Sequence, residues 1–237
     1  MKLIKIHKAY MLNMLNIIIL LLVAIISFIL FLINIKTDTN YNNYFYHLEL
    51  LSSYVDMFIL YFKLVMIMLF CYVLGSSYTK KSDSYHLLIL NFPHIRIKYL
   101  LTKILLSLFI PLFFMFIMFL IFSYVGIFFT NWYYVTKNII NLFITCYLII
   151  TIYGLLSIIM ALIIPSTYAC FIPGIIFVFG ELLKDHMSGK MFLNIFELFF
   201  PLINNSDASF TLYGIYHLIL LMIIYINLII LLYLKKR

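Results

Sequence analysis

The sequence predicts an all-α integral membrane protein with six transmembrane helices. Two features of its composition lead to this prediction: 66% of the 237 residues are hydrophobic and only 10% are charged. A soluble domain typically carries about 25% charged and 45–50% apolar residues, so no soluble fold could cover this much apolar surface. The third feature is that the apolar residues fall in runs of about 20, the length that crosses a bilayer.

We expect these runs to form one transmembrane domain over residues 1–237. The first run follows a basic N-terminus, but it is too long for the core of a signal peptide and lacks an A-x-A cleavage site, so we expect it to be retained. The fifth run is the shortest. The expected helices cover residues 12–35, 54–77, 101–128, 139–163, 167–183 and 213–234.

The charge pattern predicts the orientation in the membrane. Three segments that share one side of a six-helix protein contain eleven of the sixteen Lys and Arg residues and a single acidic residue, Asp83. By the positive-inside rule this side is cytoplasmic, so both termini are expected there. The net charge of +8 is thus a membrane signal, and no nucleic-acid partner is expected. The basic residues are Lys2, Lys5, Lys8, Lys80, Lys81, Arg96, Lys98, Lys103, Lys235, Lys236 and Arg237.

On the opposite side, the segment Met191–Leu202 is apolar but too short to span. It predicts an interfacial or re-entrant segment before the last helix; an ordinary loop helix resting on the bilayer is the alternative. Glu181, near the end of the fifth helix, has two interpretations: it belongs to a polar patch on the translocation path or subunit interface, or Gly180 breaks the helix beside it and leaves it at the membrane interface.

The cytoplasmic segment between the second and third helices is too long for a simple turn. Ser82 or Asp83 can cap a short amphipathic helix that Asn91 and Pro93 would stop. A basic stretch then leads into the third helix. Such an element could receive a push from a soluble partner, or could merely anchor the loop.

This segment resembles the coupling region of permease subunits of type-2 ABC exporters. In that family, a short helix and a leucine-rich turn are followed by Pro, a basic residue three positions later, and Lys seven after that. This chain has Leu88–Leu90, Pro93, Arg96 and Lys103 at those spacings. The chain length, the six-helix layout and the extra segment before the last helix are also similar.

The resemblance implies that this chain is not itself an enzyme. A separate ABC ATPase subunit would bind ATP and Mg, because the chain has no P-loop: Lys80 stands where the second Gly of a P-loop is required. We therefore expect no catalytic, cofactor or metal site in this chain. The residues expected to contact the ATPase are Ser84, Tyr85, Leu87, Leu88, Leu90, Pro93, Arg96 and Lys103.

The same resemblance implies the remaining partners. These are a second permease chain, identical or homologous, and an amphipathic peptide moved out of a bacterial cell or its membrane, as in bacteriocin self-protection and phenol-soluble modulin exporters. Two alternatives stay open: an ATP-independent membrane protein that confers immunity by sequestering a toxin, and a channel or ion-coupled carrier.

Two ionisable residues in the second expected helix, Asp56 and Lys63, are candidates for the translocation path or the dimer seam. They are seven residues apart, hence on one helix face about 10 Å apart along the axis. A charge at this depth usually faces protein or water. A purely structural pair, or a snorkelling lysine beside an interfacial aspartate, is the alternative. We expect the faces of the second and fifth helices to form the dimer seam.

Overall fold

In a computed structural model, the regular secondary structure of the described part of the chain is entirely helical, which confirms the all-α part of the predicted fold class. The structure describes residues 22, 25–26, 29, 58–79, 93–129, 136–164, 166–187, 191–202 and 212–235. Its elements are the π-helical turn η1 (Phe62–Met66), α4 (Ile67–Ser76), α6 (Pro93–Phe129), α7 (Thr136–Ile163), the 3-10 turn η3 (Tyr168–Phe171), α8 (Ile172–Met187), α9 (Met191–Phe199) and α10 (Leu212–Lys235).

Three of these helices are long and apolar enough to cross a bilayer. The spans lie within α6, α7 and α10 and cover Ile97–Tyr124, Ile140–Ile163 and Gly214–Lys235. They agree with the third, fourth and sixth expected helices. The helix formed by residues 58–76 and the helix α8 are shorter, and the first expected helix is described at four residues only, all helical. Six membrane crossings therefore stay a prediction.

Proline marks two of the helix starts. The helix α6 begins at Pro93, eight residues before the expected start at 101, because proline suits the first turn, where its missing N–H has no helical partner. Pro173 lies in the first turn of α8 for the same reason. Pro111 lies inside α6, and the helix continues past it.

The expected break at Gly180 is wrong. The helix α8 continues through this residue to Met187. A Cβ at Gly180 would lie 2.6 Å from the ring of Phe196 and 2.9 Å from Leu202. The glycine here gives room for the side chains of Phe196 and Leu202, and it does not end the helix.

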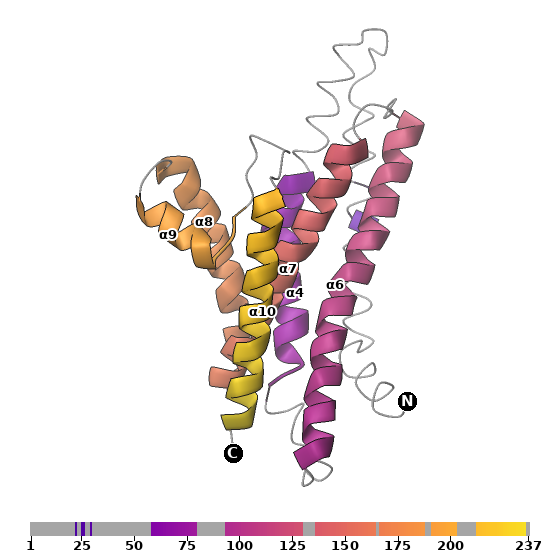
Figure 1. Cartoon of the computed structure of the whole chain (residues 1–237). Helices are drawn as coiled ribbons and strands as arrows, with labels where there is room; N and C mark the ends of the chain where they lie inside the picture. The colour runs from indigo at the N-terminus through magenta and orange to yellow at the C-terminus, as the bar shows by residue number, and fades with distance from the viewer. Residues whose placement is uncertain are drawn as a thin grey trace.

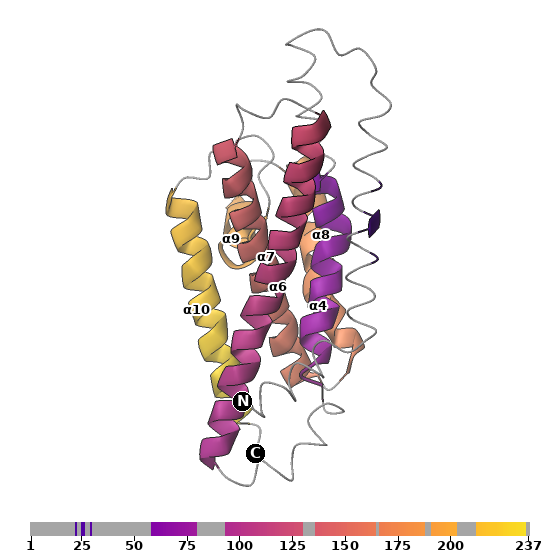
Figure 2. The same cartoon turned by 90° about the vertical axis from the view of Figure 1, so that its right-hand side faces the viewer.

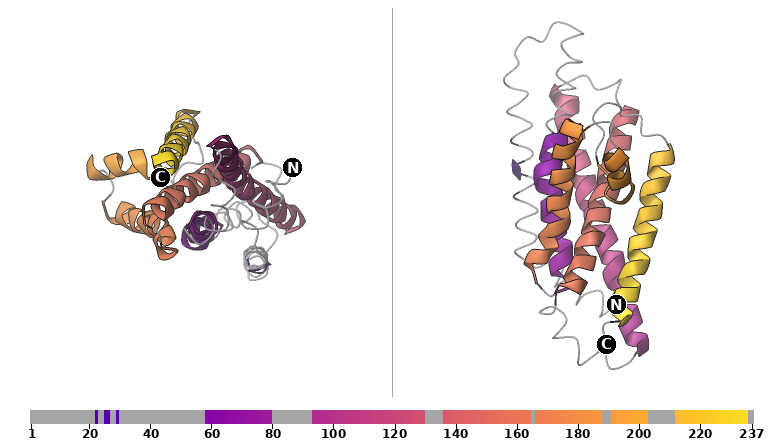
Figure 3. Two further views of the ribbon diagram at one scale, coloured as in Figure 1. Left: turned by 90° about the horizontal axis from the view of Figure 1, so that it is seen from below. Right: turned by 90° about the vertical axis from the view of Figure 1, so that its left-hand side faces the viewer.

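The helix α7 is the centre of the bundle. It packs against α4, α6, α8 and α10 (Figures 1 and 2), and 78% of its apolar span is buried, compared with 39% for α6 and 22% for α10. Seen along the bundle axis, α10 lies at the periphery (Figure 3, left). One face of α10 therefore contacts α7, and the opposite face is exposed.

Small residues and hydrogen bonds join α4 to α7. Gly75 faces Ser157, and Gly154 accommodates the side chain of Leu74, so the two backbones approach closely. The Ser157 hydroxyl donates to the carbonyl oxygen of Cys71, and the Cys71 thiol donates to the carbonyl oxygen of Tyr153 at 3.6 Å. Each helix thus donates one side-chain hydrogen bond to the backbone of the other.

Three helix ends meet at one end of the bundle: the C-terminal ends of α4 and α10 and the N-terminal end of α6 (Figure 1). This arrangement places Lys98, Lys103 and Lys235 at the same end. The predicted orientation requires such a grouping. Which side of the membrane this end faces stays a prediction.

Candidate functional site: a polar cluster within the bundle

Lys63 lies in a π-helical turn inside an otherwise α-helical segment. Residues 58–61 are α-helical, Phe62–Met66 form η1, and α4 follows. A π turn is rare, occurs mostly as a single turn inside an α-helix, and is frequent at functional sites. The wider turn changes the direction in which Lys63 leaves the helix, relative to an uninterrupted α-helix.

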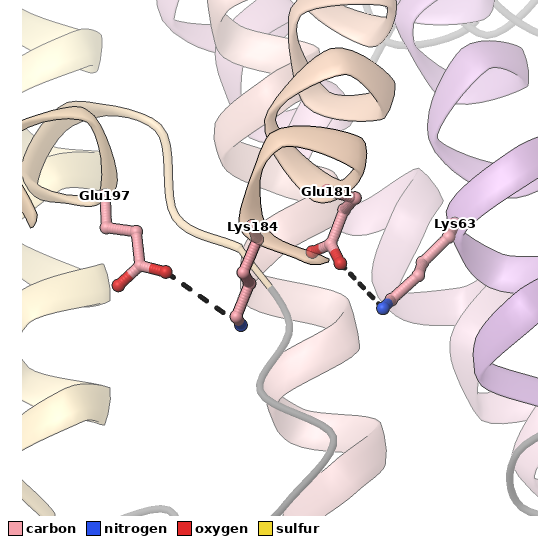
Figure 4. Close-up of polar contacts among 4 residues, drawn as sticks. All are labelled: Lys63, Glu181, Lys184 and Glu197. Carbon is pink, nitrogen blue, oxygen red and sulfur yellow. Dashed lines mark ion pairs between the residues drawn. The ribbon is translucent and has the colours of Figure 1, made fainter. Parts of the chain in front are cut away.

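The partner of Lys63 is Glu181 of α8. The ammonium nitrogen Nζ lies 2.6 Å from Oε2 of the carboxylate (Figure 4), and the two side chains are only 16% and 10% exposed. An unpaired charge at the bilayer centre costs at least about 2.5–3.5 kcal/mol. Pairing two charges in one place lowers this cost, because each neutralises the other. The pair thus explains how both ionised groups can lie inside an apolar bundle.

The position of the ion pair in the bundle follows from the contacts between α4 and α8, which lie side by side (Figure 3, right). The rings of Tyr72 and Phe171 stack with their centroids 5.2 Å apart, and Met68 packs on Gly174 one turn further along. Along this contact the residue numbers of α4 decrease while those of α8 increase, so the two helices are antiparallel. The ion pair lies nine residues beyond Ile172, about 13 Å along the helix. It therefore lies inside the helix bundle, and its depth in a bilayer stays a prediction.

Tyr153 of α7 adds a hydroxyl to this neighbourhood. The residue is fully buried, and within the described part of the chain its hydroxyl has no hydrogen-bond partner. Its ring packs edge-to-face on Phe177 with centroids 5.0 Å apart. Glu181 and Tyr225 lie close enough to interact electrostatically with the hydroxyl. Four helical segments thus contribute a polar side chain to one region of the bundle interior.

Four charged side chains, Lys63, Glu181, Lys184 and Glu197, form a row that continues from α8 to α9, here called the charged row. Lys184 lies one turn after Glu181 and approaches Glu197 of α9 at 3.9 Å (Figure 4). The helix α9 also contacts α10, where the Tyr225 hydroxyl donates to the carbonyl oxygen of Phe199 at 2.8 Å. Lys63, Glu181, Lys184 and Glu197 therefore alternate in sign across three helical segments.

The segment Met191–Leu202, expected to be interfacial or re-entrant, forms α9 and a short extended end. It folds back beside α8 (Figure 1), with Phe196 and Leu202 packed over Gly180. Its position relative to the bilayer surface stays a prediction. Through these contacts α9 covers one side of α8 next to the charged row.

At the opposite end of the bundle, Lys103 holds α4 and α6 together. Its side chain is only 2% exposed, and its ammonium group lies 4.0 Å from the ring centroid of Tyr78 and 5.6 Å from that of Tyr99. Cation–π contacts of this kind are stronger when they are desolvated. The two helix ends that flank the expected coupling segment are therefore joined directly.

The other expected ATPase-contact residues are only partly described. Pro93 and Arg96 lie in the first turns of α6, and Lys103 follows in the same helix. The expected contacts Ser84, Tyr85, Leu87, Leu88 and Leu90 lie outside the described residues, as does Asp56.

The partner of Lys63 differs from the one expected from the sequence, Asp56 on the same helix. A signal for Glu181 is nevertheless present in the sequence. Glu181 is the only charged residue in the expected fifth helix, and a lone basic residue in one span usually pairs with a lone acidic residue in another.

The described residues show no group of three or more His, Cys, Asp or Glu side chains that could hold a metal ion. The thiols of Cys71, Cys146 and Cys170 are buried and not in disulfides. Comparison of the chain with protein-family models, with curated proteins and with solved structures found no match.

Proposed function

We propose that this chain is the multi-pass transmembrane subunit of an ATP-driven exporter in a bacterial cell membrane. A separate ABC ATPase would hydrolyse ATP, and the substrate would be an amphipathic peptide. The observation that carries the proposal is the Lys63–Glu181 ion pair, set in a π-helical turn and flanked by the Tyr153 hydroxyl. Polar and ionisable groups at this depth mark substrate pathways in membrane proteins.

The ion pair suits a path for an amphipathic helix. When α4 and α8 are together, Lys63 and Glu181 neutralise each other and the bundle interior is closed. If the two helices separate, each charge needs a new partner, because an uncompensated buried charge is strongly destabilising. The charged side chains of an amphipathic peptide would supply those partners, while its apolar face would meet the surrounding Phe, Leu and Ile residues.

The contact of Lys103 with Tyr78 supports coupling to a soluble partner. The expected coupling segment, Gly75–Lys103, begins in the last turn of α4 and ends in α6, and Lys103 near its end contacts Tyr78 near its start. A push on the segment would therefore move both helices together. Because Lys63 lies on the helix that continues into α4, the motion would reach the ion pair.

The contact with the ATPase is tested with the Leu87→Asp/Leu88→Asp variant. Burial of one leucine side chain contributes about 1.5–3 kcal/mol, so two charged replacements should abolish co-purification of the ATPase. Unchanged association together with unchanged coupled ATP hydrolysis would contradict the assigned contact.

The role of the ion pair is tested with Lys63→Met, which keeps the side-chain length and removes the charge. Lys98→Met, at an exposed position near the start of α6, is the matched control. We expect ATP-dependent efflux of a fluorescent cationic amphipathic peptide from cells to fall with Lys63→Met and to persist with Lys98→Met, at equal membrane insertion and assembly. Wild-type efflux by Lys63→Met would leave Lys63 as a tolerated structural residue.

An ion-coupled carrier is the second candidate, because paired intramembrane ionisable residues also form proton relays. Collapse of the proton gradient at constant ATP distinguishes the two. Persistent efflux favours the ATP-driven exporter, and abolished efflux favours the carrier. An immunity protein that only sequesters its toxin would retain the peptide with or without ATP.

A further inference from the structure

We infer that the exposed face of α10 is a dimerisation surface, on which a second copy of this chain binds with Asn227 at the centre of the contact. The inference does not rest on the proposed transport activity. It rests on the position of one polar residue on an otherwise apolar helix face.

Asn227 points away from the bundle. The buried face of α10 carries Leu218, Tyr225 and Ile229, which are at most 8% exposed. Successive residues turn by 100°, so Asn227 lies on the opposite side of the helix from these three, and it is exposed. Its amide has no hydrogen-bond partner among the residues that the structure describes.

The depth of Asn227 excludes contact with water at the membrane surface. The span runs from Gly214 to Lys235, and Asn227 lies within about 4 Å of its midpoint along the axis. Lysine can snorkel to the interface on its long side chain, but asparagine is too short to do so. Lipid tails offer neither donor nor acceptor, so the amide requires a protein partner.

The residues around Asn227 form a stripe that suits helix packing. They are large, apolar or aromatic, and between 43% and 67% exposed. Their spacing of three or four residues is the pattern of left-handed helix pairs in membranes. The stripe consists of Tyr216, Leu220, Ile223, Leu231 and Leu234, with Asn227 in the middle.

The chemistry of the amide favours a second copy as the partner. Copies in one membrane have the same orientation, so two α10 helices related by a two-fold axis along the membrane normal are parallel. In that arrangement Asn227 meets Asn227. A carboxamide both donates and accepts hydrogen bonds, so the pair is self-complementary. A single buried asparagine in an apolar seam also fixes the register and the number of helices.

This surface differs from the seam expected from the sequence, which involved the second and fifth helices. Of the two charges expected at that seam, Lys63 contacts Glu181 within one chain, and Asp56 lies outside the described residues. The Asn227 amide is left for a contact between chains.

The experiment compares Asn227→Leu with Asn227→Gln in lipid bilayers, with Ile224→Leu on the same face as the control. Dimerisation is measured by single-molecule photobleaching over a range of protein-to-lipid ratios. Asn227→Leu removes a hydrogen bond between two membrane helices. Loss of such a bond should raise the dissociation constant of the dimer about tenfold. Asn227→Gln, which keeps the amide, and Ile224→Leu should stay close to wild type.

Cysteine cross-linking provides a second measurement that does not depend on stability. Cysteines at Leu220 and Ile223 should cross-link two chains through a disulfide, whereas a cysteine at Ile226, on the bundle side, should not. A dimer unaffected by Asn227→Leu with equal cross-linking at Ile226 would overturn the inference. So would a wild-type chain that is monomeric at all ratios, or cross-links that join α10 to a different protein.

Discussion

At the residue scale, Gly75 and Gly154 show how closely α4 and α7 approach. A Cβ at Gly75 would lie 2.7–2.8 Å from the side chain of Cys170 as well as against Ser157. These contacts involve buried groups that have little room to move. The absence of a side chain at Gly75 is therefore a packing requirement.

Gly75→Ala should destabilise the bundle by about 1–3 kcal/mol, the usual cost of overpacking a core. The control is Ser76→Ala at the next position, where only a 3.3 Å hydrogen bond to Val73 is lost. Unfolding in mixed micelles measures both. Equal stability of the two variants would show that α4 and α7 can move apart enough to admit the alanine methyl group without a loss of free energy of unfolding.

The Lys63–Glu181 pair predicts strong non-additivity. Glu181→Leu removes the carboxylate that lies 2.6 Å from the Lys63 ammonium and should cost about 3–5 kcal/mol. The double variant Lys63→Met/Glu181→Leu replaces both charges by apolar groups and should be close to wild type, since such replacements are often neutral or stabilising.

The same unfolding measurement completes the double-mutant cycle. The coupling energy should be large and favourable to the pair, as expected for residues in direct contact. Additive effects of the two substitutions would mean that the charges are solvated independently.

At the element scale, Lys103 predicts how α4 and α6 move. Lys103→Met keeps most of the buried volume but loses the cation–π contacts with Tyr78 and Tyr99. We expect the ends of the two helices to separate more readily. Lys103 was expected to contact the ATPase, but it is buried against Tyr78, so stimulation of the ATPase by the membrane subunit should fall while ATPase binding persists.

The control for that measurement is Lys98→Met, at an exposed position one turn earlier in α6. Its effect should be small, because an exposed charge in this region has no buried contact to lose. A larger effect of Lys98→Met than of Lys103→Met would indicate that ATPase stimulation depends on surface charge and not on the contact of Lys103 with Tyr78 and Tyr99.

The elements also show which parts of the fold are predictable from the sequence. Long apolar runs gave the bounds of α7 and α10 to within three residues, because the bilayer thickness sets their length. The shorter segments were less predictable. Gly180 has the sequence signature of a break, but the approach of Phe196 from a non-neighbouring helix explains the glycine instead.

The π turn at Phe62–Met66 and the Lys63–Glu181 pair lie beyond local sequence rules for a similar reason. The first depends on how residues 58–61 and α4 each pack on α7, and the second on the antiparallel register of α4 and α8. Neither the π turn nor the ion pair can therefore be predicted from one segment alone. Lys63 was predictable as a site residue, but its partner was predictable only from both spans together.

At the scale of the whole molecule, the arrangement of helix ends predicts membrane topology. Lys98 and Lys235 lie at one end of the bundle, and Lys184 lies beyond the ion pair toward the other end. Single cysteines at 98 and 235 should react with a membrane-impermeant maleimide only after the cytoplasmic side is opened. A cysteine at 184, where the native side chain is 21% exposed, should react in intact cells.

A reporter fusion tests the same orientation without relying on cysteine accessibility. Fusion of a reporter enzyme after Lys235 should be active only if this end is cytoplasmic. Labelling of the cysteines at 98 and 235 from opposite sides of the membrane would contradict the arrangement of α6 and α10 in the bundle.

The π turn has a consequence for how this chain tolerates insertions and deletions. A π turn is an α-helix that contains one residue more than its hydrogen-bond pattern needs. Deleting Val65, which is exposed within Phe62–Met66, would restore an ordinary helix and rotate residues 58–61 by about 100° relative to α4. Phe58 and Lys63 could not then both keep their contacts with the other helices. The segment should accept substitutions at its exposed positions more readily than any change in its length.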